Sequence, residues 1–236
     1  MALLIAFGPE FSEPGEFQLT LVRFGRSVFG LEMNAKRIFE YLRRPGYALR
    51  YIGYKAHEFL HRNEPWIAPG AVRFCASKLK SDQIGLEWGS GRSTRWYASR
   101  LGKLLSIEFD PNWHRKVSRM ITSQVAAECR FIPLDHPLEQ PTRRDYDPLP
   151  AYVAVVEEFA DESLDFVVVD GHYRTACIKQ ALPKLKEGGL LLVDDTGWLP
   201  LGEWGVPSSW PIVHQSANLM KHTTIWQKPT NSARAQ

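Results

Sequence analysis

Apolar positions in the second half of the chain gather into short runs that alternate with longer amphipathic stretches. Each short run is nearly continuous in apolar residues, which is typical of a strand buried on both faces of a sheet. The predicted strands are residues 84–88, 104–109, 130–134, 164–170 and 190–194, with a final one at 223–229. The helices predicted around them are residues 93–101, 111–127, 151–160 and 173–186. This alternation indicates an α/β fold with a parallel sheet and helices on both faces.

Glycine, proline and capping residues set the predicted ends of these helices. Gly102 is expected to stop the first helix, and Asp110 is expected to cap the second, with Pro111 at its first position. Pro183 is expected to kink or shorten the last helix, which the glycine pair 188–189 then ends.

The N-terminal part of the chain is predicted to form a small extension. Residues 17–22 alternate apolar and polar side chains like a half-buried strand, which could pair with residues 2–7. Two helices broken at residues 45–46 are predicted over 34–62, and another helix over 66–79. The expected organisation is an extension over residues 1–65, a main domain over 66–229 and a tail over 230–236.

The most informative stretch runs from Ile84 to Thr94 and reads Ile-Gly-Leu-Glu-Trp-Gly-Ser-Gly-Arg-Ser-Thr. A buried strand there breaks into a turn at Gly89 and Gly91, which let the backbone turn sharply and approach a ligand closely. A helix then opens, and the next strand delivers a carboxylate, Glu108, at its end. This order of elements is the layout of a nucleotide-binding βαβ unit, in which the acid binds ribose hydroxyls.

The same turn favours S-adenosylmethionine over a dinucleotide. A dinucleotide fingerprint has a third glycine where this chain has Thr94, and the carboxylate of Glu87 would repel a pyrophosphate. S-adenosylmethionine has no phosphate, but its sulfonium and amino groups are cationic. Glu87 suits those charges, and the helix N-terminus near Ser93 can accept the carboxylate of the ligand.

The run Glu-Trp-Gly-Ser-Gly-Arg-Ser-Thr over residues 87–94, with Val-Asp-Gly at 169–171, resembles the motifs of class I S-adenosylmethionine-dependent methyltransferases, and within them a bacterial group. The resemblance covers residues 66–229 and implies a Rossmann-like, seven-stranded, mostly parallel sheet with an antiparallel last strand. It also implies that Glu108 binds the ribose and that Asp135 lies near the adenine. The cofactor-binding residues that it predicts are Glu87, Gly89, Ser90, Gly91, Ser93, Glu108, Asp135 and Asp170.

Acids at the ends of two neighbouring predicted strands are candidate metal ligands. Asp170 follows one strand, and Asp194 and Asp195 follow the next. Metal-dependent O-methyltransferases of the catechol type place an Asp and an Asp-Asn pair there to bind Mg²⁺, which orients and acidifies a substrate hydroxyl. Here the pair is Asp-Asp, and Tyr173 stands where that family has its basic lysine. The alternative is that Asp194 and Asp195 only cap a strand and a loop.

Candidate groups for proton removal follow the strand at 164–170. His172 is the leading general base because an imidazole titrates near neutral pH, and Asp170 is the second candidate. An alternative of equal weight is that His172 lies at the edge of the site and only contacts substrate or solvent. Residues 196–216 contain three tryptophans that could stack on a sugar or aromatic ring, or pack as ordinary loop residues. They are Trp198, Trp204 and Trp210.

Composition limits the partners and the location. The chain has 236 residues and a formal net charge of +3, which is too small to favour a nucleic-acid partner. Its three cysteines are widely spaced and are predicted to be buried free thiols, which fits a reducing, cytoplasmic location. No apolar run approaches the length of a membrane span.

The functional hypothesis is methyl transfer from S-adenosylmethionine to an oxygen of a small-molecule or sugar-like acceptor, with Mg²⁺ as a further candidate cofactor. Oxygen is favoured over nitrogen only by the partial likeness to the catechol type. Two alternatives stay open, an NAD-dependent oxidoreductase on the same fold and a non-catalytic module that keeps the cofactor pocket. The sequence indicates no oligomeric state.

Overall fold

The computed structural model describes residues 45–123, 126–136 and 142–230. The chain divides into two units between Leu60 and His61. In the first unit the described element is helix α2, Pro45–Leu60, which begins at the proline where the sequence predicts a break. The strands predicted at 2–7 and 17–22, and the helix predicted before residue 45, lie outside the described residues.

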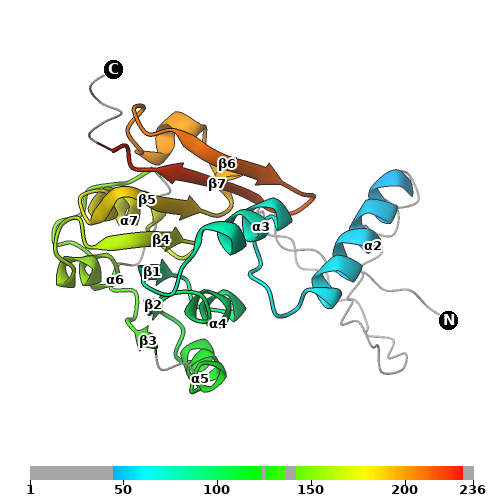
Figure 1. Cartoon of the computed structure of the whole chain (residues 1–236), viewed down its shortest axis with the longest axis horizontal. Coiled ribbons are helices and arrows are strands. Elements are labelled where there is room, and N and C mark those ends of the chain that lie inside the picture. The colour runs from blue at the N-terminus through cyan, green and yellow to red at the C-terminus, as the bar shows by residue number, and fades with distance from the viewer. Residues whose placement is uncertain (1–44, 124–125, 137–141, 231–236) are drawn as a thin grey trace, which may run out of the picture. The chain divides into compact units, whose positions relative to one another are not determined.

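The second unit contains a seven-stranded sheet within the described residues, in the order β3-β2-β1-β4-β5-β7-β6 (Figure 1). The strands are β1 Ile84–Trp88, β2 Lys103–Glu108, β3 Ala127–Phe131, β4 Leu164–Val169, β5 Leu185–Val193, β6 Ile212–Ala217 and β7 His222–Gln227. The strands from β3 to β5 in this order pair in parallel, whereas β7 pairs antiparallel with both β5 and β6. The predicted fold class, with its antiparallel last strand, is therefore confirmed.

Helices cover both faces of the sheet, and the side chains of β4 show how the two faces separate. Val167 and Val169 belong to a core shared with α6 and α7, whereas Phe166 and Val168 belong to a core shared with α3 and α4. Successive residues of a strand point to opposite faces, so a continuous apolar run supplies both cores. The helices are α3 Pro69–Lys78, α4 Arg92–Ala98, α5 Pro111–Met120, α6 Ala151–Ala154 and α7 Arg174–Ala181. Short 3₁₀ helices are η1 Val155–Glu158, η2 Thr196–Trp198 and η3 Leu201–Trp204.

Several predicted boundaries differ from the structure. Helix α7 ends at Ala181, before Pro183, because proline cannot continue a helix. The glycine pair 188–189 does not end that helix. It lies inside β5, where Gly188 has a φ of +75° and the register against β4 shifts. Helix α5 ends at Met120 rather than at residue 127, so β3 starts earlier than predicted.

Strand β6 was not predicted, because its residues lie in the stretch 196–216 that was interpreted as a loop. The strand is at the edge of the sheet, and its side chains are half-buried or exposed. An edge strand of this kind lacks the continuous apolar run that marked the inner strands.

The topology places two turns against each other at the carboxyl ends of the central strands. The chain builds β1, β2 and β3 outward, then returns to place β4 on the other side of β1. Gly89 follows β1 and Asp170 follows β4, and the N–H of Asp170 donates to the carbonyl of Trp88 at 2.9 Å. In open α/β sheets, ligands bind outside the carboxyl ends of the strands at such a switch point.

No helix in the described residues is both long enough and apolar enough to cross a membrane.

Candidate cofactor and acceptor site

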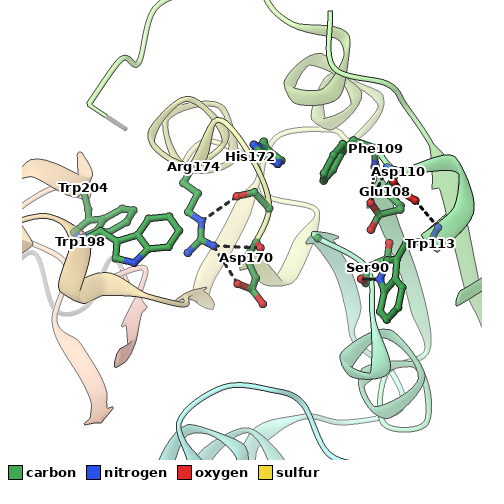
Figure 2. A pocket seen from close by; sticks show the side chains of 12 residues that line it. Ser90, Glu108, Phe109, Asp110, Trp113, Asp170, His172, Arg174, Trp198 and Trp204 are labelled. Atoms are coloured by element: carbon green, nitrogen blue, oxygen red, sulfur yellow. Dashed lines mark hydrogen bonds and ion pairs between the residues drawn. The ribbon is translucent and has the colours of Figure 1, made fainter. Parts of the chain in front are cut away.

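A cavity of about 520 Å³ opens at this switch point (Figure 2). Its lining residues come from the end of β2, from the turns after β1, β2 and β4, from the first turns of α5 and α7, and from the 3₁₀ helices after β5. They are Gly89, Ser90, Glu108, Phe109, Asp110, Trp113, Asp170, Gly171, His172, Arg174, Trp198 and Trp204. Figure 2 shows Glu108, Phe109 and Trp113 at one end and Arg174 and Trp198 at the other. We call these the Glu108 end and the Arg174 end.

The carboxylate at the Glu108 end is fixed by the backbone that follows it. One oxygen of Glu108, Oε1, accepts the N–H groups of Phe109 and Asp110, each at 2.9 Å. The side chain is 3% exposed, and burial raises the pKa of Glu108 above its ordinary value. The sequence predicted this residue at the carboxyl end of β2, and the structure places it in the cavity lining.

Trp113 also lines the Glu108 end, although the sequence analysis did not single it out. Its indole Nε1 donates to the carbonyl of Ser90 at 2.7 Å, which holds the ring against the glycine turn. Asp110 caps α5 by accepting the N–H of Trp113 at 2.6 Å, as predicted from the Asp-Pro pair. The sequence did contain a signal for this role of Trp113, because a tryptophan in the first turn of a helix that follows a strand end lies near the ligand-binding edge of the sheet.

Glu87 lies outside the cavity lining, in a network beneath the glycine turn. It is fully buried and accepts the hydroxyls of Ser93, Thr94 and Ser106, each at 2.6 Å. Burial raises the pKa of Glu87 to about 7, against the lowering effect of those hydroxyls. The network ties the end of β1 to the start of α4 and to β2. Ser93, which was also predicted to contact the cofactor, is bonded into this network instead of lining the cavity.

The two glycines of the turn differ in what they require. Gly89 has a φ of +96°, and a Cβ there would lie 2.7 Å from the carbonyl carbon and oxygen of Asp170. Gly91 has an extended φ of −175°, and a Cβ there would come no closer than 3.6 Å to another atom, the Oγ of Ser93. The turn therefore needs glycine only at Gly89. Gly91 is not in the cavity lining.

Asp135 is not brought to the cavity. Its Oδ2 accepts the N–H of Ala151 at 2.9 Å, at the start of α6, and its Oδ1 contacts His136 Nδ1 at 2.9 Å. Its side chain is 43% exposed. Burial acts to raise the pKa of Asp135, but the hydrogen bonds from Ala151 and His136 lower it overall. These contacts make Asp135 a helix cap in the structure.

Arg174 organises the other end of the cavity. Its guanidinium donates to the carbonyls of Gly171 at 2.9 Å and Asp194 at 2.5 Å, and to the carboxylate of Asp170 at 3.2 Å. The same group lies 4.4 Å from the ring centroid of Trp198, an indole that is 62% exposed. Arg174 thus fixes both the acid and the tryptophan that face the cavity.

His172 lies between the two ends of the cavity (Figure 2). Its ring packs edge to face on Phe109, with ring centroids 4.4 Å apart and an interplanar angle of 84°. The structure therefore brings His172 and Asp170 together with Glu108 around one cavity.

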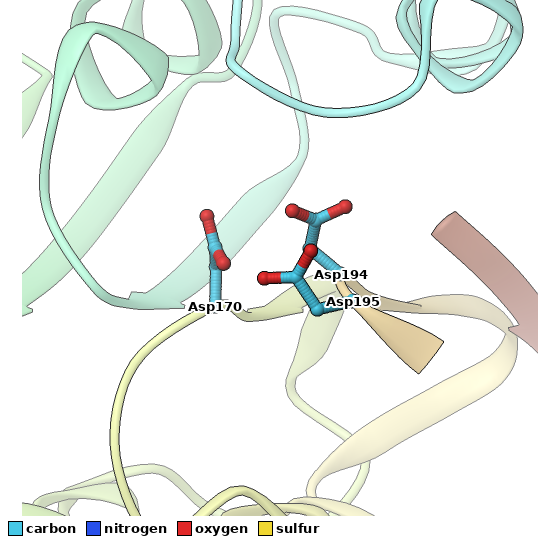
Figure 3. A group of neighbouring side chains, drawn as sticks. All are labelled: Asp170, Asp194 and Asp195. Carbon is cyan, nitrogen blue, oxygen red and sulfur yellow. The ribbon is translucent and has the colours of Figure 1, made fainter. Parts of the chain in front are cut away.

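The three acids that were candidate metal ligands do converge, with one carboxylate oxygen of each within 4.8 Å of the others (Figure 3). Asp170 lines the cavity, whereas Asp194 and Asp195 do not. Burial and the neighbouring Asp194 raise the pKa of Asp170 above its ordinary range. A lysine that the sequence analysis did not single out, Lys221, contacts Asp194 at 2.7 Å and Asp195 at 3.1 Å.

A family model described as a methyltransferase domain matches residues 86–196. Residues 86–196 therefore form a methyltransferase domain, as the resemblance predicted. Among solved structures, a methyltransferase from Geobacter sulfurreducens is 11% identical with a TM-score of 0.51, and the match covers 84% of this chain and 98% of that one. An rRNA methylase from Streptococcus thermophilus is 13% identical with a TM-score of 0.50, and the match covers 70% and 100%. At these identities the likeness is one of fold. No curated protein matches the chain.

The part of this methyltransferase that the family model matches contains every site residue predicted from the sequence, from Glu87 to Asp195. Trp198, Trp204 and Lys221 lie beyond it. Two tryptophans of the cavity lining and the lysine in the acid cluster therefore come from the part of the chain that the family model does not match.

Proposed function

We propose that this methyltransferase transfers the methyl group of S-adenosylmethionine to an oxygen of a small acceptor that carries a ring. The observation that carries the proposal is one cavity with a fixed carboxylate, Glu108, at one end and a group suited to proton removal, His172, between its two ends. S-adenosylmethionine supplies a methyl carbon already activated by its sulfonium. The protein then needs mainly to align donor and acceptor and to take one proton.

The charges of the Glu108 end support S-adenosylmethionine over NAD. Both ionisable side chains that line this end are acids, Glu108 and Asp110. The cation among the described lining residues is Arg174, and it is paired with Asp170. A pyrophosphate would meet like charges without a free cation to balance it, whereas a sulfonium and an ammonium are attracted to such a site.

The Arg174 end supports a small, uncharged or cationic acceptor with a flat face. Trp198 presents an exposed indole at the cavity, and such a ring stacks on aromatic rings and on the apolar faces of sugars. The cavity volume of about 520 Å³ falls within the roughly 300–1,000 Å³ typical of small-molecule sites. The acids around it would repel the phosphates of a nucleic acid, which supports a small acceptor over an RNA.

The magnesium of the catechol type does not fit the donor set of this chain. Both oxygens of Asp194 are hydrogen-bonded, one to Lys221 at 2.7 Å and the other to Thr223 at 2.6 Å. We therefore assign proton removal to His172, with Asp170 as the second candidate, and not to a metal-bound hydroxyl.

Calorimetric titration of the full chain with S-adenosylhomocysteine, the demethylated product, and with NAD tests the cofactor. We expect the S-adenosyl compound to bind and to raise the melting temperature by mass action, and NAD to do neither. Binding of NAD without binding of S-adenosylhomocysteine would refute the proposal.

Transfer of a radiolabelled methyl group to pools of hydroxylated ring compounds, with ribosomal RNA as a separate pool, tests the acceptor. Once an acceptor is found, His172→Ala should lose about 100-fold or more in rate, in the range of general base catalysis. His61→Ala, an exposed histidine away from the cavity, is the matched control. Labelling confined to RNA would refute the small acceptor, and full activity in His172→Ala would remove His172 as the base.

A further inference from the structure

The acid cluster holds a built-in cation, the ammonium of Lys221. Its Nζ lies 2.7 Å from Asp194 Oδ2 and 3.1 Å from Asp195 Oδ2, and the side chain is 8% exposed. The same Nζ lies 4.6 Å from the ring centroid of Trp66, so the indole packs against the ammonium as well. Two carboxylates at salt-bridge distance from one amine stabilise its ammonium form, so the lysine is held as a cation.

The turn between β6 and β7 holds Lys221 in this position. The side-chain oxygen of Asn218 accepts the N–H groups of Met220 and Lys221, each at 2.8 Å. The N–H of Asn218 in turn donates to the carbonyl of Lys221 at 2.9 Å. These hydrogen bonds fix the backbone at Lys221. The ammonium is therefore held next to the acids by the protein itself, and no bound ligand is needed to position it.

The remaining contacts of the cluster add a hydroxyl donor, Thr223, and a second cation, Arg174. Thr223 donates to Asp194 Oδ1 at 2.6 Å, and this hydroxyl itself accepts the N–H of Ala68 at 3.0 Å. Arg174 lies 3.2 Å from Asp170 and 3.6 Å from Asp195. Three carboxylates thus face two fixed cations, and a divalent ion at the centre would be repelled by both.

We infer that Lys221 takes the place of a divalent metal in this methyltransferase, holding Asp194 and Asp195 so that Asp170 alone faces the cavity. Lys221 is a positioning residue, because it touches the acids and does not line the cavity. The inference is independent of the acceptor and of the methyl transfer, since it concerns which cation the three carboxylates hold. It has a specific consequence: without its ammonium, the cluster becomes a set of oxygen ligands of the kind that hard divalent cations bind.

Titration of the full chain with Mn²⁺ alone, followed by the electron paramagnetic resonance of free Mn²⁺, tests this. The variants are Lys221→Met and Lys221→Gln, which keep a side chain of similar length without charge, and Lys221→Arg, which keeps the charge. We expect the neutral variants to bind one Mn²⁺ at least about 100-fold more tightly than the wild type, because a cation in contact has been removed. Wild type and Lys221→Arg should show no saturable binding over the Mn²⁺ concentrations that saturate the neutral variants.

The double variant Lys221→Met with Asp195→Asn is the control, and it should lose the Mn²⁺ that the single variant gains. A merely structural lysine would lower the melting temperature when replaced but would not create a metal site. Saturable Mn²⁺ binding by the wild type would overturn the inference. So would a folded neutral variant that binds Mn²⁺ no better than the wild type. The use of two neutral variants covers the case in which one of them does not fold.

Discussion

Glu108 has one carboxylate oxygen held by two backbone N–H groups, and its side chain lines the cavity. If the carboxylate accepts a ribose hydroxyl, Glu108→Ala removes a hydrogen bond to a charged acceptor, which contributes roughly 1.5–3 kcal/mol. We expect the Kd for S-adenosylhomocysteine to rise about 10- to 150-fold, as measured by calorimetry at one pH.

The matched control is Glu157→Ala, which removes an exposed carboxylate in η1, outside the cavity lining. It should bind S-adenosylhomocysteine as the wild type does. The melting temperature of each variant must show that the fold survives. Equal affinity in Glu108→Ala and the wild type would show that Glu108 is not the ribose ligand.

Glu87 predicts a dependence of stability on pH. Its pKa in the folded chain is about 7, above the ordinary 4.5, so the folded chain holds this proton more tightly than the unfolded chain. The free energy of unfolding should therefore fall as pH rises between about 4.5 and 7. Glutamine imitates the protonated acid. Between pH 5 and 8, Glu87→Gln should gain stability relative to the wild type, by on the order of 3 kcal/mol at most.

Urea denaturation of both proteins across this pH range measures the effect, and the other acids cancel in the difference. Glu87→Ala should be destabilised at every pH, because it leaves the hydroxyls of Ser93, Thr94 and Ser106 without their acceptor. Parallel pH profiles for the wild type and Glu87→Gln would contradict the assignment of a raised pKa.

At the scale of elements, the turn between β1 and α4 contains two glycines that look equivalent in the sequence but differ in their backbone conformation. Gly89→Ala combines a positive φ with a Cβ 2.7 Å from the backbone of Asp170. We expect conformational strain to lower its free energy of unfolding by roughly 1–3 kcal/mol. The close contact should lower it further, and the melting temperature should fall accordingly. Gly91→Ala meets neither obstacle, so it should melt close to the wild type.

Thermal unfolding of the two variants, side by side, checks this difference. Titration of Gly91→Ala with S-adenosylhomocysteine then isolates any effect of the methyl group on the ligand from an effect on the fold. Equal melting temperatures for the two variants would contradict the difference between the turn positions.

The inner strands could be predicted from the sequence because both of their faces are buried, as the two cores that share β4 show. Strand β6 could not, because its half-exposed residues at the sheet edge resemble a loop. The helix end predicted at Gly188 and Gly189 was wrong for a physical reason. A glycine with a positive φ is common at a helix end, but it also occurs at an irregularity within a strand. Only the pairing of this segment with β4 distinguishes the two.

The candidate site shows the same limit. Glu108 is the last residue of β2, and Asp170 and His172 lie within three residues of the end of β4, so strand ends alone predict that they meet at one edge. Lys221 could not be placed in this way. It reaches the acids from the turn between two antiparallel strands, and one of those strands was not predicted. A charged side chain on a turn far away in the sequence can be placed at the site only when the strand order is known.

For the whole molecule, the order of the strands decides where a ligand can bind. The turn after β1 and the turn after β4 meet because the chain returns to the centre of the sheet after β3. Every residue of the cavity lining lies between Gly89 and Trp204, in the unit that begins at His61. The sheet and the cores on its two faces belong to the same unit.

A fragment of residues 61–236 should therefore fold by itself and keep the cofactor site. We expect one cooperative unfolding transition, followed by circular dichroism, and an affinity for S-adenosylhomocysteine within about twofold of the full chain, where twofold is only about 0.4 kcal/mol. A fragment of residues 82–236 is the contrast, because it removes α3 and with it Ala71, Val72 and Cys75 from a core. Losing the burial of Val72 alone removes roughly 1.5 kcal/mol or more, so this shorter fragment should be much less stable. Failure of the 61–236 fragment to unfold cooperatively, or loss of its affinity for S-adenosylhomocysteine, would show that the first sixty residues belong to the methyltransferase unit.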